Sequence, residues 1–188
     1  MYEMRPAVDR DHEAITGLIA ARNRWFEDRG IVPNVADGSL AATLIGDRAE
    51  DGRRPLAWVL CEDGQVLGCT VLLSDIQAWG WTDQQRAEPS LLMLGTYTDP
   101  AHRHDKPGRL MAWWSVDYAA RLGGVRWVRR VTFADRLMRY YRDQQKWNLV
   151  DTVIRDGRHA YLMQRRAERL KNFESLVADS GSLTASAS

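Results

Sequence analysis

The sequence lacks the features of disulfide-rich, metal-binding and secreted proteins. It has only two cysteines among 188 residues, Cys61 and Cys69, and each lies inside an apolar run, without the spacing of a metal site. Two such cysteines build no disulfide framework, which favours a reducing compartment. The opening residues, MYEMRPAVDRDHE, are charged from the third position and contain no apolar signal-peptide core. We therefore expect a cytoplasmic protein.

Long apolar runs are also absent, and the net charge is small. No stretch approaches the about 18 consecutive apolar residues of a membrane-spanning helix, so we expect no membrane partner. Lysine and arginine number 26 against 25 aspartates and glutamates, a formal net charge of +1. This balance gives no general attraction to nucleic acid, and we expect no nucleic-acid partner. The basic stretches RWVRR and RYYR leave a binding module for nucleic acid or protein as a minor hypothesis.

The chain does have a regular succession of strand and helix patterns. The clearest is a hairpin, in which PLAWVLC and QVLGCTVLL flank Asp63 and Gly64, a pair that suits a tight turn with positive φ. A strand in YEMRPAV, a helix from Asp9 or Asp11 to about Gly30 and a weaker helix in GSLAATLIGDRAE precede it. SDIQAWGWTDQQRAEPS, after the hairpin, is predicted to be a polar loop.

The second half of the chain continues in the same way. We predict a buried strand in LLMLGTYT, a helix over about 107–122, a strand in VRWVRRVTF, a helix in DRLMRYYRDQQ and a hairpin around Asp156 and Gly157. The order is therefore β-α-α-β-β-β-α-β-α-β-β, an α/β fold with a mixed sheet and helices on both of its faces. Residues 166–188 turn charged and end in ADSGSLTASAS, so we expect a disordered tail there.

The segment DPAHRHDKPGRLM joins a strand to a helix and is a candidate anion site. The N-terminus of a helix offers unpaired N–H groups and the positive end of a dipole to a phosphate. Pro107 suits the first helical position, where a missing N–H costs little. A second interpretation is a solvated loop in which Asp105 caps the helix. His102 and His104 beside Asp105 match no metal-ligand spacing, so we predict no metal site.

The order of elements and three segments resemble the GCN5-related N-acetyltransferase (GNAT) superfamily. YTDPAHRHDKPGRLM is similar to the family's strand-Pro-x-x-Arg-x-x-Gly-x-Gly-helix segment, and RLMRYYRDQQKWNLVDTV to its helix-Tyr and Gly-Phe-strand segment. YEMRPAVDRDHEAITGLI is similar to its opening strand and helix. The resemblance covers residues 1–165 and implies a GNAT-like acyltransferase domain. It implies acetyl transfer from acetyl-CoA to a primary amine, by direct attack in a ternary complex.

The resemblance also implies partners and cofactor-binding residues. The acceptor is an amine of a small molecule or of a protein, and a homodimer is a family-level expectation. The cofactor-binding residues implied by the resemblance are Thr96, Thr98, Arg103, His104, Asp105, Lys106, Pro107, Gly108 and Arg109. Lys106 replaces the first glycine of the pattern and Pro107 has no N–H to donate, so the site is a modified one. A carboxylate at Asp105 repels phosphate unless it pairs with Arg103 or Lys106.

In this family a tyrosine of the helix that follows the next strand is the proposed general acid for the departing thiolate. Tyr141 is our candidate and Tyr140 the alternative. Tyr141 precedes Trp147 by one residue more than the family spacing, and Lys146 replaces the glycine, so we expect an extra residue in the turn. No general base is identified, because LLMLGTYT carries no carboxylate. The carboxylates that flank the preceding loop, as candidates acting through water, are Asp75, Asp83 and Glu88.

The acceptor side is less defined. Trp25, Trp79 and Trp81 are candidates for an acceptor pocket, although for any single one of them a core or surface role is favoured. An alternative hypothesis is a degenerate GNAT-fold protein that binds a ligand or a protein partner without catalysis. The modified loop, the missing strand carboxylate and Ala134, where the family often has an asparagine, favour this alternative.

Overall fold

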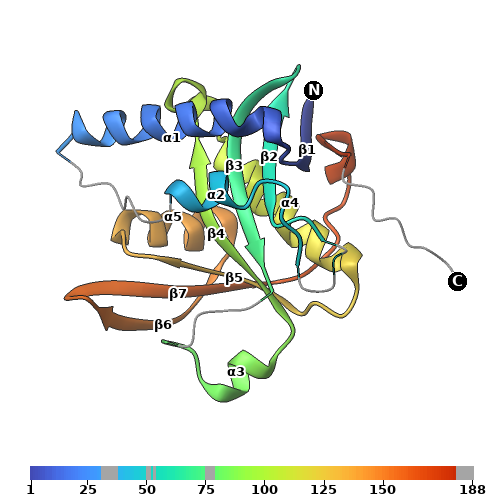
Figure 1. Ribbon diagram of the computed structural model, residues 1–188. Helices are drawn as coiled ribbons and strands as arrows, with labels where there is room; N and C mark the ends of the chain where they lie inside the picture. Colours follow the sequence, from blue (N-terminus) through green and yellow to red (C-terminus); the bar gives the residue numbers. More distant parts are fainter. Residues whose placement is uncertain (31–37, 50–51, 53, 75–78, 181–188) are drawn as a thin grey trace, which may run out of the picture. The chain divides into compact units, whose positions relative to one another are not determined.

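The computed structural model describes residues 1–30, 38–49, 52, 54–74 and 79–180 (Figure 1). The elements are β1 (Tyr2–Pro6), η1 (Asp9–Asp11), α1 (His12–Glu27), α2 (Gly38–Thr43), β2 (Ala57–Glu62), β3 (Gln65–Leu73), α3 (Asp83–Ala87), β4 (Ser90–Thr98), η3 (Pro100–Asp105), α4 (Pro107–Leu122), β5 (Trp127–Thr132), α5 (Asp135–Gln145), β6 (Asn148–Arg155), β7 (Arg158–Arg166), η4 (Phe173–Ser175) and β8 (Val177–Asp179). The predicted order is confirmed, with α3 and β8 as additions. Among the described helices, none has both the length and the apolar character needed to cross a bilayer.

The eight strands form one mixed sheet in the order β6-β7-β5-β4-β3-β2-β1-β8. Most neighbouring strands are antiparallel, whereas β4 with β5 and β1 with β8 are parallel. The chain divides into two compact units, the first made of residues 1–72, 95–114 and 171–188, and the second of residues 73–94 and 115–170. The chain passes from the second unit to the first inside β4, between Leu94 and Gly95.

The core of the first unit is packed around the β2–β3 hairpin. Trp58 and Trp114 are buried with ring centroids 4.6 Å apart. A Cβ on Gly68 would lie 2.7 Å from Met111 Cε and 2.9 Å from the carbonyl oxygen of Tyr97, so this close approach requires a glycine. The predicted turn at Asp63 and Gly64 has positive φ at both residues, as its sequence indicates.

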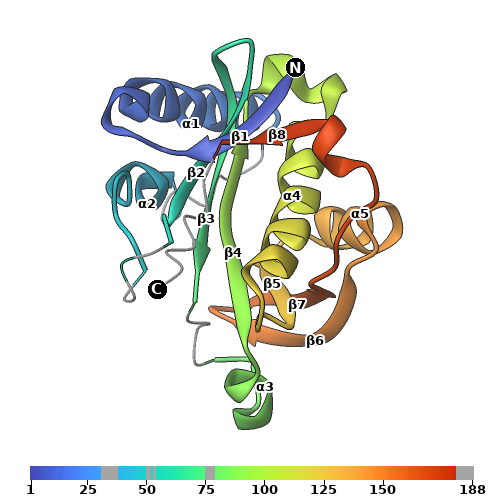
Figure 2. The same ribbon diagram turned by 90° about the vertical axis from the view of Figure 1, so that its right-hand side faces the viewer.

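Residues 166–180 are not the disordered tail that their composition predicts. Arg166 is the last residue of β7, and β8 pairs in parallel with β1, from Tyr2 opposite Val177 to Met4 opposite Asp179 (Figure 2). Phe173 and Val177 are buried. The strand has only three residues, Val177–Asp179, which are too few to show an alternating pattern, so the sequence did not indicate it. Residues 181–188 lie outside the described residues.

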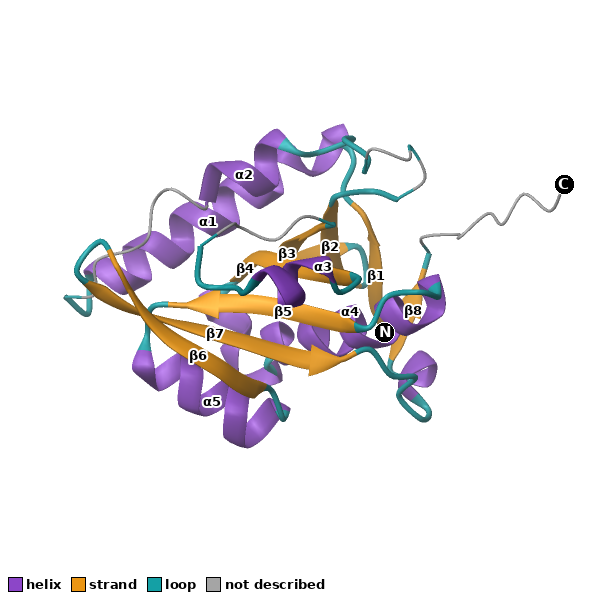
Figure 3. Ribbon diagram, turned by 90° about the horizontal axis from the view of Figure 1, so that it is seen from below, coloured by secondary structure: helices purple, strands orange, loops and turns teal. Residues whose placement is uncertain are grey.

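The second unit holds β5, β7 and β6 side by side, with α5 in contact with β5 and β6 (Figure 3). Adjacent residues of a strand point to opposite faces, so Arg129 and Arg130 of β5 lie on different faces of this sheet. Both arginines are buried. The stretch RWVRR therefore does not form the basic surface that its composition indicated.

The segment after β7 is fixed to α4 by one carboxylate of the second unit. Asp117 is 1% exposed and accepts hydrogen bonds from Arg121 Nε at 3.0 Å, Arg169 Nε at 3.1 Å and the Leu170 N–H at 2.8 Å. Two cations and a backbone donor satisfy this buried charge, as a buried charge requires. The chain thus leaves β7 along a defined path.

Candidate active site

The candidate phosphate-binding loop lies in the first unit and has a defined backbone. Asp99 caps the 3₁₀ helix η3, and its Oδ1 accepts the Ala101 N–H at 2.8 Å. Lys106 then takes a left-handed conformation with φ 54°, and α4 begins at Pro107. The predicted helix start at Pro107 is therefore confirmed, and Lys106 takes the conformation that a glycine would adopt most easily.

The first turn of α4 leaves a backbone donor available. The N–H groups of Arg109 and Leu110 both donate to the Lys106 carbonyl, at 2.8 and 3.4 Å. No carbonyl in the described part of the chain accepts the Gly108 N–H. A Cβ on Gly108 would meet only Thr98 Cγ2, at 3.6 Å, so the space beside this residue is open. An anion placed there meets an N–H group at the positive end of a 16-residue helix.

Two buried polar atoms close to this turn in the sequence lack partners. Thr96 Oγ1 and Arg109 Nε are buried, and neither has a hydrogen-bond partner among the described residues. The Arg109 guanidinium lies 4.8 Å from the centre of the Trp113 ring. Leaving a buried donor or acceptor unpaired costs about 1–3 kcal/mol, so both atoms are suited to receive a polar partner. Both belong to the predicted cofactor-binding set.

Asp105 behaves differently from both interpretations of the sequence. It does not cap α4, because Lys106 is the residue that precedes the helix. Its Oδ2 lies 3.6 Å from His102 Nδ1, so its partner is neither Arg103 nor Lys106. Arg103, His104 and Lys106 are exposed, and neither Arg103 nor Lys106 forms an ion pair within the described ranges. Their positive charge is available to a ligand.

The candidate general acids lie in the second unit, on α5. Tyr140 and Tyr141 are half-buried with ring centroids 6.0 Å apart. The buried Arg130 guanidinium lies 3.6 Å from the centre of the Tyr141 ring, and its burial lowers the pKa of Arg130, opposed by Tyr141. The helix ends at Gln145, the next residue, Lys146, has φ 60°, and the Trp147 N–H donates to the Tyr141 carbonyl at 3.1 Å. This left-handed turn accommodates the extra residue predicted between Tyr141 and Trp147.

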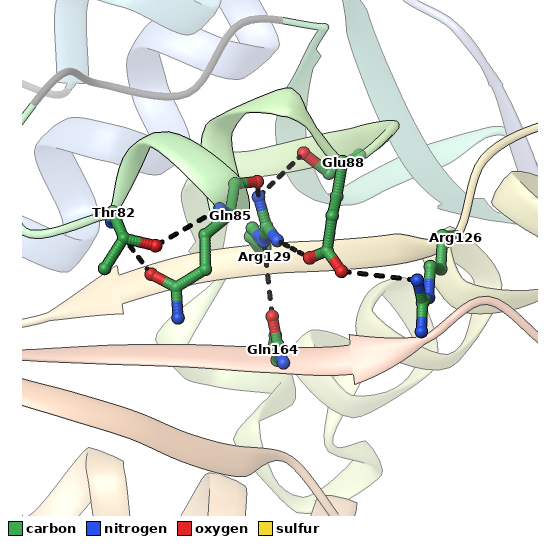
Figure 4. A network of polar contacts seen from close by, with 7 residues as sticks. Thr82, Gln85, Glu88, Arg126, Arg129 and Gln164 are labelled. Atoms are coloured by element: carbon green, nitrogen blue, oxygen red, sulfur yellow. Dashed lines mark hydrogen bonds and ion pairs between the residues drawn. The ribbon is translucent and has the colours of Figure 1, made fainter.

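Of the three carboxylates considered as a base, Glu88 is engaged in a buried network (Figure 4). Its carboxylate pairs with Arg129 Nη2 at 2.7 Å and Arg126 Nη1 at 3.3 Å. Arg129 is fully buried and also donates to Gln164 Oε1 and the Gln85 carbonyl. Asp83 is exposed and pairs with Arg86, and Asp75 lies outside the described residues. The general base therefore stays unassigned.

The sequence does not indicate this network, but it does carry a signal for the short helix that contributes Gln85. In TDQQ, the Thr82 hydroxyl accepts the Gln85 N–H and the Gln85 side chain accepts the Thr82 N–H, a capping box that begins α3.

The three tryptophans considered for an acceptor pocket have different surroundings. Trp81 is buried with Arg129 4.8 Å from its ring, Trp79 is half-buried in the same unit, and Trp25 of the first unit lies under Arg29.

Comparison with known proteins identifies the fold. No protein-family model matches the sequence, and no curated protein matches it significantly. Solved structures do match, among them a GNAT-family acetyltransferase of Listeria monocytogenes (TM-score 0.66, 14% identity, 88% of this chain and 94% of that one). The ribosomal-protein-S18-alanine N-acetyltransferase of Escherichia coli matches with TM-score 0.59, 14% identity and 90% and 96% coverage.

A third match is a protein of Salmonella typhimurium described as an acetyltransferase and solved with its cofactor acetyl-CoA. Its TM-score is 0.60, with 17% identity and coverage of 90% of this chain and 96% of that one. At these identities the likeness is one of fold. It confirms the fold class that the sequence predicted.

Proposed function

We propose that this chain, which has the fold of GNAT acetyltransferases, transfers an acetyl group from acetyl-CoA to a primary amine. The observation that carries the proposal is the start of α4. There an open backbone N–H at Gly108, the unpartnered Nε of Arg109 and the unpaired charges of Arg103 and Lys106 belong to one loop and helix turn. Acetyl-CoA carries a pyrophosphate that needs such donors.

The fit extends to the strand before the loop. Gly95 lies within β4 with φ 57°, a conformation that bends a strand, and the ladder between β4 and β5 covers only Ser90–Leu92 among the described residues. In our proposal a backbone N–H of β4 beyond this ladder donates to the thioester carbonyl and stabilises the oxyanion. Thr96 and Thr98 stay assigned to the cofactor.

The chemistry that acetyl-CoA supplies is an acyl group on a thioester. The amine nitrogen forms a bond to the carbonyl carbon, the carbon–sulfur bond breaks, and the thiolate takes a proton. We assign that proton to the phenol of Tyr141, with Tyr140 as the alternative. The proton that the amine loses goes to water, since no carboxylate is assigned as base.

The first test is a calorimetric titration of acetyl-CoA into the full chain and into the double variant Arg103→Ala/Lys106→Ala. We expect micromolar binding that weakens about tenfold or more in the variant, as the loss of two phosphate contacts predicts. The matched control is Arg10→Ala/Lys171→Ala, which removes two exposed cations of the same unit. No binding at millimolar acetyl-CoA, or equal weakening in both variants, contradicts the proposal.

Turnover separates this function from the degenerate alternative. Tyr141→Phe is expected to reduce kcat with acetyl-CoA binding intact, because the phenol acts on the leaving group. The acceptor panel must include small amines and protein amino groups, since the Escherichia coli structural neighbour acts on an alanine of a ribosomal protein. Binding of acetyl-CoA without transfer to any amine supports the degenerate alternative.

A further inference from the structure

Two adjacent arginines of β5 are buried, but only the first of them has polar partners. Arg129 pairs with Glu88 and donates to Gln164 Oε1 and the Gln85 carbonyl (Figure 4). Arg130 is 5% exposed, and its Nε and Nη1 atoms have no hydrogen-bond partner among the described residues. A buried charge without a partner is costly, because the charge has lost its hydration and gained nothing in return. Arg130 is therefore kept in the fold at a cost to stability.

The neighbours of the Arg130 guanidinium are two aromatic rings of the same unit. Its central carbon lies 3.6 Å from the centre of the Tyr141 ring and 5.2 Å from the centre of the Trp147 ring. Burial lowers the pKa of Arg130, and within the described ranges Tyr141 is the one group whose charge opposes this shift. A ring face attracts a cation, but it carries no net charge that could balance the guanidinium.

A tyrosine that protonates a departing thiolate needs help from its surroundings. An ordinary thiol has a pKa of about 8.5 and an ordinary phenol one of about 10, so proton transfer from the phenol to the thiolate is unfavourable by about thirtyfold. A phenolate spreads its negative charge from the oxygen into the ring. A cation on the ring face therefore stabilises a phenolate more than a phenol, and a guanidinium keeps its charge even when it is buried.

We propose that Arg130 is a positioning residue for the general acid, whose positive charge stabilises the phenolate left when Tyr141 gives its proton to the thiolate. This inference rests on the proposed function and selects Tyr141 over Tyr140 as the acid. In this step the O–H bond of Tyr141 breaks and an S–H bond forms on CoA, and water then returns a proton to the phenolate. The missing partner of Arg130 is thus a charge that exists only during the reaction, and the cation is in place before it forms.

The first test measures the phenolate directly and needs no substrate. Ultraviolet difference titration of the parent against Tyr141→Phe isolates the phenolate of Tyr141, and Arg130→Met against Arg130→Met/Tyr141→Phe isolates it without the cation. The ratio of phenolate to phenol at Tyr141 is expected to be about tenfold lower in the Arg130→Met chain at each pH. Arg166→Met, which removes an exposed arginine at the end of β7, is the control and leaves the ratio unchanged. An equal ratio with and without Arg130 overturns the inference.

Thermal stability separates this role from a structural one. Removal of an unpaired buried charge is expected to leave the thermal midpoint of Arg130→Met unchanged or to raise it. Arg130→Gln removes the same charge but keeps an N–H donor, and it is expected to behave in the same way. If both variants melt well below the parent or do not fold, Arg130 is a structural residue and the inference is overturned.

Turnover separates a failure of this inference from a failure of the proposed function. With an amine that the parent chain acetylates, Arg130→Met is expected to lower kcat about tenfold and to leave KM for acetyl-CoA unchanged. In the Tyr141→Phe chain the same change has no further effect, because Arg130 acts through the phenol. Transfer that survives Tyr141→Phe or Arg130→Met keeps the acetyltransferase and overturns the inference. A phenolate that depends on Arg130, in a chain that acetylates no amine, keeps the pairing of Arg130 with Tyr141 and overturns the proposed function.

Discussion

Lys106 and Lys146 occupy backbone positions that the GNAT pattern gives to glycine. Their φ values are 54° and 60°. A side chain in this left-handed conformation costs about 1–2 kcal/mol, of which the greater entropy of an unfolded glycine cancels about 0.5–1. The two lysines differ in surroundings, because Lys106 precedes the open turn of α4 whereas Lys146 Nζ donates to the Asp143 carbonyl.

We expect Lys106→Gly and Lys146→Gly each to raise the free energy of unfolding by up to about 1 kcal/mol, measured by urea denaturation. Only Lys106→Gly is expected to weaken the binding of acetyl-CoA, because only that change removes a charge from the candidate pyrophosphate site. Lys146→Gly is thus the control for the backbone effect. A Lys106→Gly variant that binds acetyl-CoA as tightly as the parent would remove this lysine from the site.

For single residues, the sequence shows which positions are unusual but not which side chains meet. Lys106 and Lys146 stand where the resembled pattern has glycine, and the structure gives both a positive φ, as glycine positions often require. The partner of Asp105 was not predicted, because the proximity of His102 depends on the tight turn of η3. Arg129 and Arg130 looked like surface cations, since only the fold reveals their Glu88, Tyr141 and Trp147 neighbours.

Among the elements, the junction between β1 and α1 depends on a paired carboxylate. Arg5 donates to both oxygens of Asp11, at 2.6 and 2.8 Å, and the Val8 N–H donates to the same carboxylate at 2.9 Å. Burial raises the pKa of Asp11, but the bonds from Arg5 and Val8 outweigh it and the net shift is downward. The folded chain therefore binds the Asp11 proton more weakly than the unfolded chain.

The sign of this shift predicts acid sensitivity. The Asp11 contribution is fully present above its ordinary pKa of about 3.9 and is lost as pH falls through the lower folded value. We expect Asp11→Asn to cost about 2 kcal/mol at pH 7, less than the about 3–5 of a fully buried pair because Arg5 keeps some exposure. Denaturant midpoints measured from pH 7 to 3 should show that the stability difference between the parent and Asp11→Asn becomes smaller below about pH 4.

Asp9→Asn is the matched control, since Asp9 is an exposed carboxylate of the same 3₁₀ helix. It is expected to change stability by no more than about 0.5 kcal/mol at any of these pH values. If the denaturant midpoints of the parent and Asp11→Asn differ by the same amount down to pH 3, the charge of the Asp11 carboxylate is not what stabilises the fold.

The element order was predictable because each strand and helix has its own periodicity or turn signal. The helix α3 was not predicted, because it has five residues and its only sequence signal is the capping box of Thr82 and Gln85. The strand β8 was not predicted, because it pairs with β1 at the other end of the described chain and no local pattern encodes such a contact.

For the whole molecule, the end of the domain lies beyond the predicted residue 165. Burial of Phe173 and Val177 contributes about 1.5–3 kcal/mol each, so the segment supplies about 3–6 kcal/mol of a total near about 5–15. Truncation after Arg165 is therefore expected to lower the thermal midpoint sharply or to prevent folding. Truncation after Ser180 is the control and removes none of these contacts.

The full-length variant Phe173→Ala keeps the test independent of truncation. Its free energy of unfolding, measured by urea denaturation, is expected to be about 3–5 kcal/mol lower, as is usual when a buried phenylalanine is replaced by alanine. A chain of residues 1–165 that melts together with the parent would show that the predicted boundary was correct after all.

The pairing of β1 with β8 has a consequence for synthesis on the ribosome. Among the described strands β1 is the first to emerge and β8 is the last, so one edge of β1 has no partner until Val177–Asp179 have left the ribosome. An unpaired strand edge is a site of association with other chains. The nascent polypeptide therefore carries an aggregation-prone edge while the residues between β1 and β8 are made, and the emergence of β8 protects it.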